Sequence, residues 1–147
     1  MRKLFFISIL ACSTLFLKSC NNDEPEQPLS IVGTWHFESF NFNITTSDPQ
    51  FTLELREMFR LIQISIDGGT IVFRENGTYT ETMHFLGQPP DIWNGVYSWS
   101  NGILSMDGQI ISHDLTNERL TLRLSARQME FEDPRIQTFI VTTTYTR

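Results

Sequence analysis

The chain has 147 residues, a length that fits one domain with appendages and a single hydrophobic core. The first 19 residues hold Arg2, Lys3 and Lys18 and no acidic residue. From Cys20 onward there are 8 arginines, no lysine and 17 aspartates and glutamates, which is a net charge of −9. Such a field repels a phosphate backbone, so nucleic acid is excluded as a partner.

The N-terminus has the pattern of a signal peptide. Met1-Arg2-Lys3 precedes a largely apolar run over residues 4–17, which is short of the roughly 20 residues that a membrane helix needs. The run ends in Leu17-Lys18-Ser19-Cys20, which resembles the lipobox of bacterial lipoproteins. The resemblance implies that residues 1–19 are removed and that Cys20 carries diacylglycerol and an N-acyl chain such as palmitate. Several acyl chains would anchor the domain to a membrane.

Cysteine usage favours this interpretation over an ordinary secreted protein with an unused Cys20. Cys12 lies within the apolar run and leaves with it, so the mature chain keeps one cysteine and forms no internal disulfide. Residues 20–28 then form an acidic tether. Its Asp23, Glu24 and Glu26 resemble the signal that sends Bacteroidetes lipoproteins to the outer face of the outer membrane, which predicts a cell-surface location; a plain spacer is the alternative.

The folded domain is predicted over residues 29–147 and opens on a long strand. Trp35 and Phe37 share one face of this strand, whereas Phe40, Phe42 and Ile44 have the opposite parity. A parity switch within one apolar run predicts a β-bulge near Glu38-Ser39.

One helix is predicted after the first strand. Residues 46–50 combine capping side chains with an early proline, and apolar residues then recur at helical spacing from Phe51 to Ile62. The end of the helix stays open, because Ile62, Ile64 and Ile66 also alternate as in a strand. A break is predicted at Asp67-Gly68-Gly69.

The remainder is predicted to be a meander of strands joined by tight turns. Turn sequences such as Glu75-Asn76-Gly77, Asn101-Gly102 and Asp107-Gly108 separate strands over residues 70–74, 78–85, 92–100, 103–106, 109–114, 119–125 and 138–146. About eight antiparallel strands at hairpin spacing, with one short helix after the first, predict an all-β up-and-down barrel, since closure removes exposed edges.

The order of these pieces resembles the lipocalin-like domains of Bacteroidetes lipoproteins. Gly33-Thr34-Trp35 opens the first strand, and Gly95-Val96-Tyr97-Ser98-Trp99 with Asn101-Gly102 follows the hairpin around Asn76. The resemblance implies a cup for a small apolar or amphipathic ligand. It also implies structural roles for Gly33, Trp35 and Arg147, in which the first-strand tryptophan closes one barrel end beneath a basic residue of the last strand.

Aromatic side chains are the candidates for lining the barrel interior, as ligand contacts or as core: Trp35, Phe37, Phe73, Tyr79, Trp93, Tyr97, Trp99 and Phe139. An eight-stranded barrel is either filled by side chains or holds one small molecule, and the sequence leaves both open. Trp93, Tyr97 and Trp99 share one strand face and form either a platform for a sugar or part of the core, of which the core is favoured.

No catalytic, metal or cofactor pattern is present. His36, His84 and His113 are not at ligand spacing, and Asp107, Asp114 and Glu118 match no calcium loop and are interpreted as solvated turn residues. The leading hypothesis is a membrane-anchored, non-enzymatic binding protein for a small apolar or amphipathic ligand or a glycan. The alternative is a filled barrel that docks an envelope protein through loops such as 86–91 or 127–135.

Overall fold

The computed structural model describes residues 29–129 and 133–147. The predicted signal peptide, Cys20 and the acidic tether lie outside the described residues. The helix α1 spans Pro49–Ser65, and the strands are β1 (Gly33–Thr46), β2 (Ile66–Phe73), β3 (Thr78–Phe85), β4 (Asp91–Ser100), β5 (Ile103–Met106), β6 (Gln109–Leu115), β7 (Arg119–Ser125) and β8 (Ile136–Thr146).

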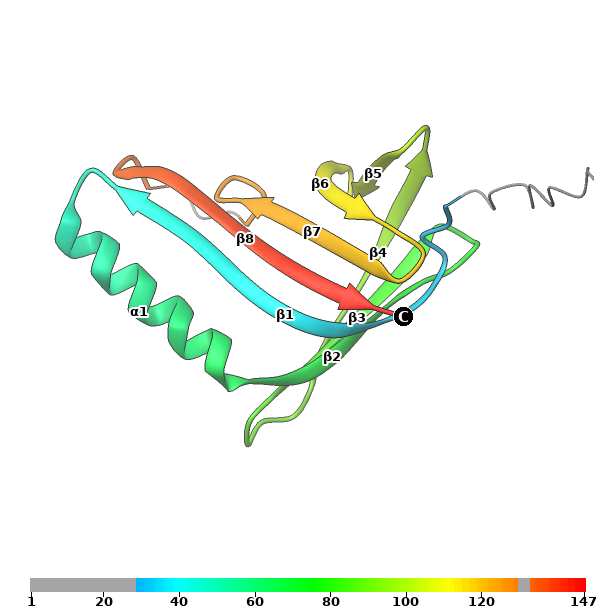
Figure 1. The fold of residues 1–147 in the computed structure, drawn as a ribbon, viewed down its shortest axis with the longest axis horizontal. Coiled ribbons are helices and arrows are strands. Elements are labelled where there is room, and N and C mark those ends of the chain that lie inside the picture. Colours follow the sequence, from blue (N-terminus) through cyan, green and yellow to red (C-terminus); the bar gives the residue numbers. More distant parts are fainter. Residues whose placement is uncertain (1–28, 130–132) are drawn as a thin grey trace, which may run out of the picture.

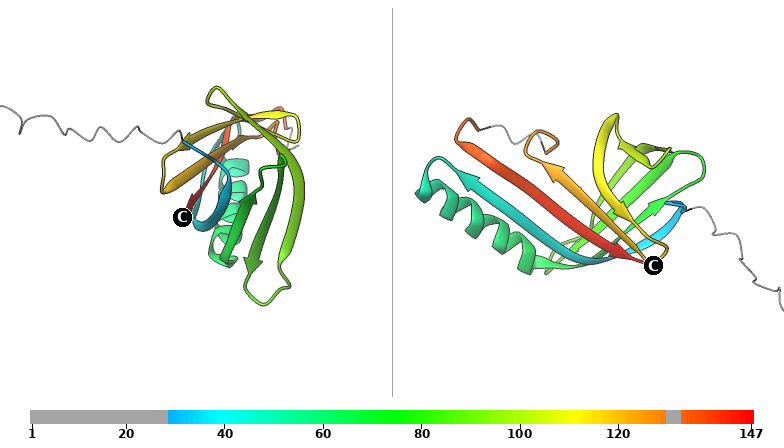
Figure 2. Two further views of the ribbon diagram at one scale, coloured as in Figure 1. Left: turned by 90° about the vertical axis from the view of Figure 1, so that its right-hand side faces the viewer. Right: turned by 45° about the horizontal axis from the view of Figure 1, so that its top comes forward.

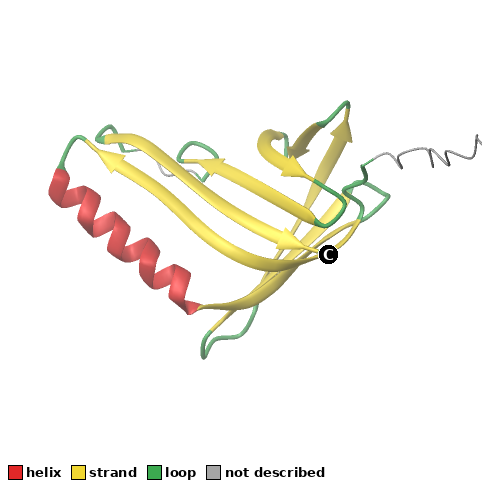
Figure 3. Ribbon diagram, in the orientation of Figure 1, coloured by secondary structure: helices red, strands yellow, loops and turns green. Residues whose placement is uncertain are grey.

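These elements form a closed antiparallel barrel with one helix after the first strand (Figures 1 and 3). Each strand pairs with the next along the chain, and β8 returns to pair with β1. The predicted fold class is therefore confirmed, and β3, β5 and β7 have the predicted bounds. Up-and-down closure gives every strand a paired neighbour on both sides.

The bulge predicted in β1 is present. The register between β1 and β8 shifts between Phe37 and Ser39, and this shift turns Phe40 and Phe42 to the same inner side as Trp35 and Phe37. β1 pairs with β2 only over residues 33–36, whereas its pairing with β8 continues to Thr46. Beyond the short β1–β2 pairing, α1 packs against β1, as Figure 2 shows.

Local capping fixes the start of α1. The Asp48 carboxylate accepts hydrogen bonds from the backbone N–H groups of Gln50 (2.9 Å) and Phe51 (3.3 Å), and Pro49 occupies the first turn, as the sequence predicts. The helix runs to Ser65, and β2 begins at the next residue. Among the described residues, no helix has the length and apolar character needed to cross a membrane.

The break predicted at Asp67-Gly68-Gly69 is wrong, because β2 runs through all three residues. Gly68 has a φ of +137°, and the β2–β3 register shifts between Ile66 and Gly68. At Gly69 a Cβ atom would lie 2.5 Å from the carbonyl oxygen of Thr82. The glycines therefore produce a bulge and a close strand approach instead of ending the strand.

Two apolar clusters fill different parts of the molecule. The first contains Trp35, Ile71, Phe73, Leu120 and Tyr145 and occupies the barrel end near the C-terminus. The second lies between α1 and the parts of β1 and β8 around Ile44 and Phe139. There the rings of Phe59 and Phe139 meet edge-on, with their centroids 5.2 Å apart. α1 thus serves as a wall of the barrel on one side only.

Two leucines of α1, Leu53 and Leu55, offer a matched test of this packing. Leu55 is 5% exposed against the second cluster, whereas Leu53 is 60% exposed on the outer surface of α1. We expect Leu55→Ala to lower the free energy of unfolding by about 2–5 kcal/mol through loss of buried area and a residual cavity. Leu53→Ala should change it by no more than about 0.5 kcal/mol. Urea denaturation measures both, and equal effects would contradict the placement of α1.

Candidate functional site

An open cavity of about 690 Å³ lies against α1, where Ile62 lines it. Its walls come from α1 and from strands on both sides of the barrel. Along β3 alternate residues line it, as expected for a strand with one inward face, whereas β4 contributes three consecutive residues from Ile92 to Asn94. The apolar part of the lining is Phe40, Ile62, Ile66, Met83, Phe85, Ile92, Trp93, Leu124, Met129 and Val141. Polar side chains are fewer, and they are Tyr79, Glu81, Asn94, Asp107, Gln128 and Thr143.

The opposite end of the barrel is closed by Trp35 and Arg147. The guanidinium carbon of Arg147 lies 4.1 Å from the centroid of the Trp35 ring, and its Nη2 donates to the carbonyl oxygens of Ser30 (2.6 Å) and Val32 (3.0 Å). The indole N–H of Trp35 donates to the Ile31 carbonyl at 2.8 Å. Gly33, with a φ of +134°, lies beside the same guanidinium. This arrangement joins the two ends of the described domain through a cation–π contact.

Most of the aromatic candidates lie in packed core and do not line the cavity. Trp35, Phe73 and Phe139 are buried, and Phe37, Tyr97 and Trp99 pack partly buried against the first cluster. Only Tyr79 and Trp93 of that set line the cavity.

Trp93 differs from Tyr97 and Trp99, its neighbours on the same face of β4. Its side chain is 46% exposed where it lines the cavity. The prediction that the aromatic stripe belongs to the core therefore holds for Tyr97 and Trp99 and not for Trp93.

The two carboxylates of the cavity lining, Glu81 and Asp107, each pair with a tyrosine. The hydroxyl of Tyr145 donates to Oε1 of Glu81, and the hydroxyl of Tyr79 donates to Oδ2 of Asp107 at 2.6 Å. The other oxygen of Asp107 accepts from the backbone N–H of Val96 at 2.9 Å. Both phenol protons are therefore directed to carboxylates that the protein itself supplies.

Glu81 keeps one acceptor oxygen free of protein partners within the described part of the chain. No residue described donates to its Oε2. Because no buried side-chain oxygen or nitrogen lacks a hydrogen-bond partner there, Oε2 is accessible from the cavity. The arrangement can therefore accept a hydrogen bond or a positive charge from a bound molecule.

Burial is the largest cause of the pKa shifts of Glu81, Tyr79 and Tyr145. Burial raises the pKa of Glu81, and the hydrogen bond from Tyr145 opposes that rise. Burial also raises the pKa values of Tyr145 and Tyr79, and the neighbouring carboxylates add to it, so both phenols stay protonated as donors.

Glu81, Tyr145 and Asp107 were missed as a group by the sequence analysis. The available signal was parity, since Glu81 lies between Tyr79 and Met83 on the inward face of β3. Asp107 was interpreted as a solvated turn residue; it does lie in an exposed turn, but its carboxylate binds Tyr79 and Val96. Among the described residues, no three His, Cys, Asp or Glu side chains are grouped so as to hold a metal ion.

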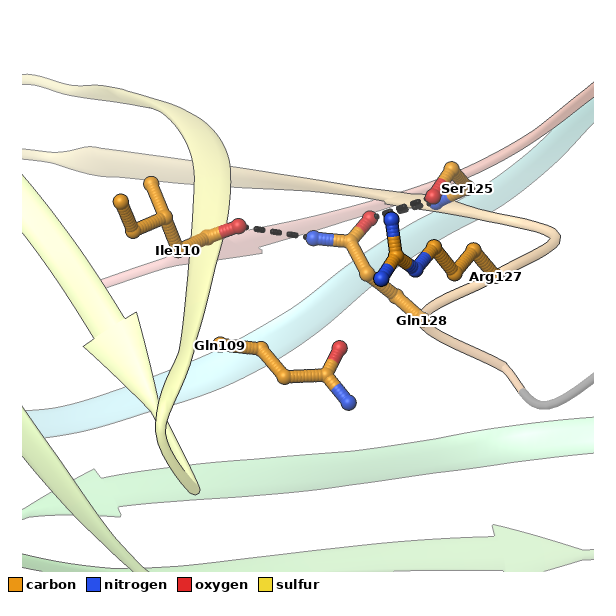
Figure 4. Close-up of a pocket in the computed structure, with 5 residues that line it drawn as sticks. All are labelled: Gln109, Ile110, Ser125, Arg127 and Gln128. Atoms are coloured by element: carbon orange, nitrogen blue, oxygen red, sulfur yellow. Dashed lines mark hydrogen bonds between the residues drawn. The ribbon is translucent and has the colours of Figure 1, made fainter.

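A second, smaller pocket of about 470 Å³ adjoins the first (Figure 4). Its main side chain is Gln128, which donates to the Ile110 carbonyl at 2.7 Å and accepts from the backbone and hydroxyl of Ser125. Arg127 lines this pocket, and Gln128 lines both pockets.

The geometry defines a closed eight-stranded barrel with one filled end and one open cavity. No protein-family model matches the chain, and no similar curated protein was found. Among solved structures, the chain is similar to the crystal structure of Echinococcus granulosus fatty-acid-binding protein 1, at 10% identity and a TM-score of 0.41 over 80% of this chain and 96% of that one. A likeness of that size carries no argument about function, and the fold class follows from the strand pairing of this chain.

Glu81→Gln tests the burial of the carboxylate through pH dependence. A carboxyl with a raised pKa in the folded state stabilises the fold below its ordinary value of 4.5, and this contribution is lost as pH rises through the folded pKa. As the pH rises above 4.5, we expect the Glu81→Gln variant to become progressively more stable relative to the parent protein. Melting temperatures from about pH 4 to pH 8 measure the trend. A stability difference that does not vary with pH would contradict it.

Proposed function

We propose that this chain is a membrane-anchored, non-enzymatic binding protein that holds a small apolar or amphipathic molecule in the barrel cavity. The single observation that carries the proposal is the open cavity of about 690 Å³ with a mainly apolar lining. Small-molecule sites are concave, mostly apolar and about 300–1,000 Å³ in volume.

The lining favours an amphipathic ligand over a glycan. A glycan presents many hydroxyl groups that need partners, whereas the walls here are aliphatic and aromatic side chains with polar groups confined to a few positions. Trp93 offers an aromatic face within this lining, which suits the apolar body of a ligand.

Attachment to the outer membrane through Cys20 belongs to the same proposal. Its support is the lipobox resemblance of residues 17–20 and the acidic residues that follow. A lipid anchor on the first mature residue and a tether of residues 20–28 would hold the binding domain at the cell surface, where it meets ligands from the medium.

Adjacent threonines of β8 give a test of the cavity. Thr143 lines the cavity, whereas Thr142 points to the opposite side of the strand. We expect the neutral fluorophore N-phenyl-1-naphthylamine to bind the parent protein saturably. Thr143→Phe should weaken that binding by about tenfold because the added ring occupies the site.

The matched control is Thr142→Phe, which adds the same ring to the outer face and should bind the fluorophore like the parent. Circular dichroism verifies that both variants are folded. Equal binding by the parent and both variants would place the fluorophore elsewhere and would contradict the cavity as the binding site.

The anchor is tested by Cys20→Ser in a bacterium that processes lipoproteins. We expect the parent to fractionate with membranes and to incorporate an alkyne-labelled palmitate, and the variant to incorporate none and to leave the membrane fraction. Protease treatment of intact cells separates a cell-surface location from a periplasmic one. An unlabelled parent would refute the lipid anchor.

A second candidate function is docking to an envelope protein, which is favoured by apolar residues on the outer face of the β4–β6 sheet. Val96, Ile103 and Ile110 are each more than half exposed there. Purification from native membranes distinguishes the two functions, because a stoichiometric protein partner supports docking and a small-molecule passenger supports ligand binding.

A further inference from the structure

The charge of the cavity restricts which amphipathic molecules it can hold. Its lining contains the carboxylates of Glu81 and Asp107, and among the described residues no lysine, arginine or histidine lines it. An apolar cavity that presents carboxylates and no cation disfavours an anionic head group, because two like charges would be brought together in a poorly solvated space.

The arginines of the described chain lie outside the lining of this cavity. After Cys20 the sequence has eight arginines and no lysine. Seven of these arginines contact groups outside the cavity lining: Arg56, Arg60, Arg74, Arg119, Arg123, Arg135 and Arg147. The eighth, Arg127, lines the adjoining pocket.

Three of the hydrogen-bond donors at or near the cavity are already committed to protein acceptors. The hydroxyls of Tyr145 and Tyr79 donate to Glu81 and Asp107, and the amide of Gln128 donates to the Ile110 carbonyl. A ligand carboxylate would have to displace these bonds or depend on the neutral donors of Trp93, Asn94 and Thr143, with no cation to balance its charge. A ligand ammonium group, in contrast, needs only the accessible Oε2 of Glu81, which accepts no hydrogen bond from the described residues.

We propose, resting on the proposed binding function, that the cavity selects amphipathic molecules with a cationic head group, such as long-chain amines, and that Glu81 receives this head group. The apolar chain of the ligand then lies against the aliphatic and aromatic walls. Asp107 contributes a second negative charge to the same lining while it holds Tyr79 in place.

The experiment uses three ligands with the same 12-carbon chain and different head groups: dodecylamine, 1-dodecanol and dodecanoate. Each competes with bound N-phenyl-1-naphthylamine on the folded domain, below its micelle concentration. We expect dodecylamine to displace the fluorophore at a concentration at least about tenfold lower than dodecanoate, with dodecanol between them.

Two variants test whether Glu81 causes the preference for the amine head group. Glu81→Gln keeps an acceptor for Tyr145 and removes the charge, so dodecylamine should lose about tenfold in affinity while dodecanol keeps its own. Glu118→Gln removes the same charge from the exposed β6–β7 turn and should leave all three affinities unchanged. This control, repeated at raised salt, separates a contact in the cavity from attraction by the overall negative charge.

The outcomes are distinct. If none of the three ligands displaces the fluorophore, the proposed binding function itself fails. If dodecanoate binds as well as dodecylamine, or if the amine preference survives Glu81→Gln, ligands bind but the assignment of the head group is overturned. Loss of dodecanoate binding in Arg127→Gln would then place an anionic head group at the adjoining pocket.

Discussion

The pairing of β1 with β8 is the constraint on which the rest of the structure depends. It closes the barrel, and its bulge between Phe37 and Ser39 keeps the apolar residues on the inside over the whole length of β1. A one-residue change in register would turn Phe40 and Phe42 outward and leave α1 without a surface to cover. Because β2 leaves β1 after His36, the same pairing creates the space that α1 occupies.

This geometry divides the interior into two regions with different roles. Around Trp35 and Tyr145 the side chains fill the barrel, and Arg147 covers that end. Toward α1, β1 and β2 no longer pair beyond His36, and the residues there line an open cavity. The sequence posed a filled barrel and an open pocket as alternatives, and both occur in one molecule: the first cluster packs one end, and the residues between α1 and the strands leave an open cavity.

The contact between Glu81 and Tyr145 connects these two regions. Tyr145 belongs to the packed end, and its hydroxyl holds a carboxylate that faces the cavity. Partial burial of this carboxylate costs free energy that an apolar residue at the same position would not cost. Such a cost is typical of residues retained for binding, where a polar group among apolar walls sets the orientation and charge of the ligand.

The sequence by itself determined the order of the elements, the helix start within residues 46–50, the bulge in β1 and the barrel class, because these depend on local pattern: parity, helical spacing and turn residues. It also carries the expected lipid anchor at Cys20, which lies outside the described residues and stays a prediction. Only the tertiary structure decided that Gly68 and Gly69 bend β2 without ending it, that Trp93 lines a cavity, and that Glu81 meets Tyr145 across 64 residues. Those facts depend on which strands face each other across the barrel, and parity within one strand carries no information about that.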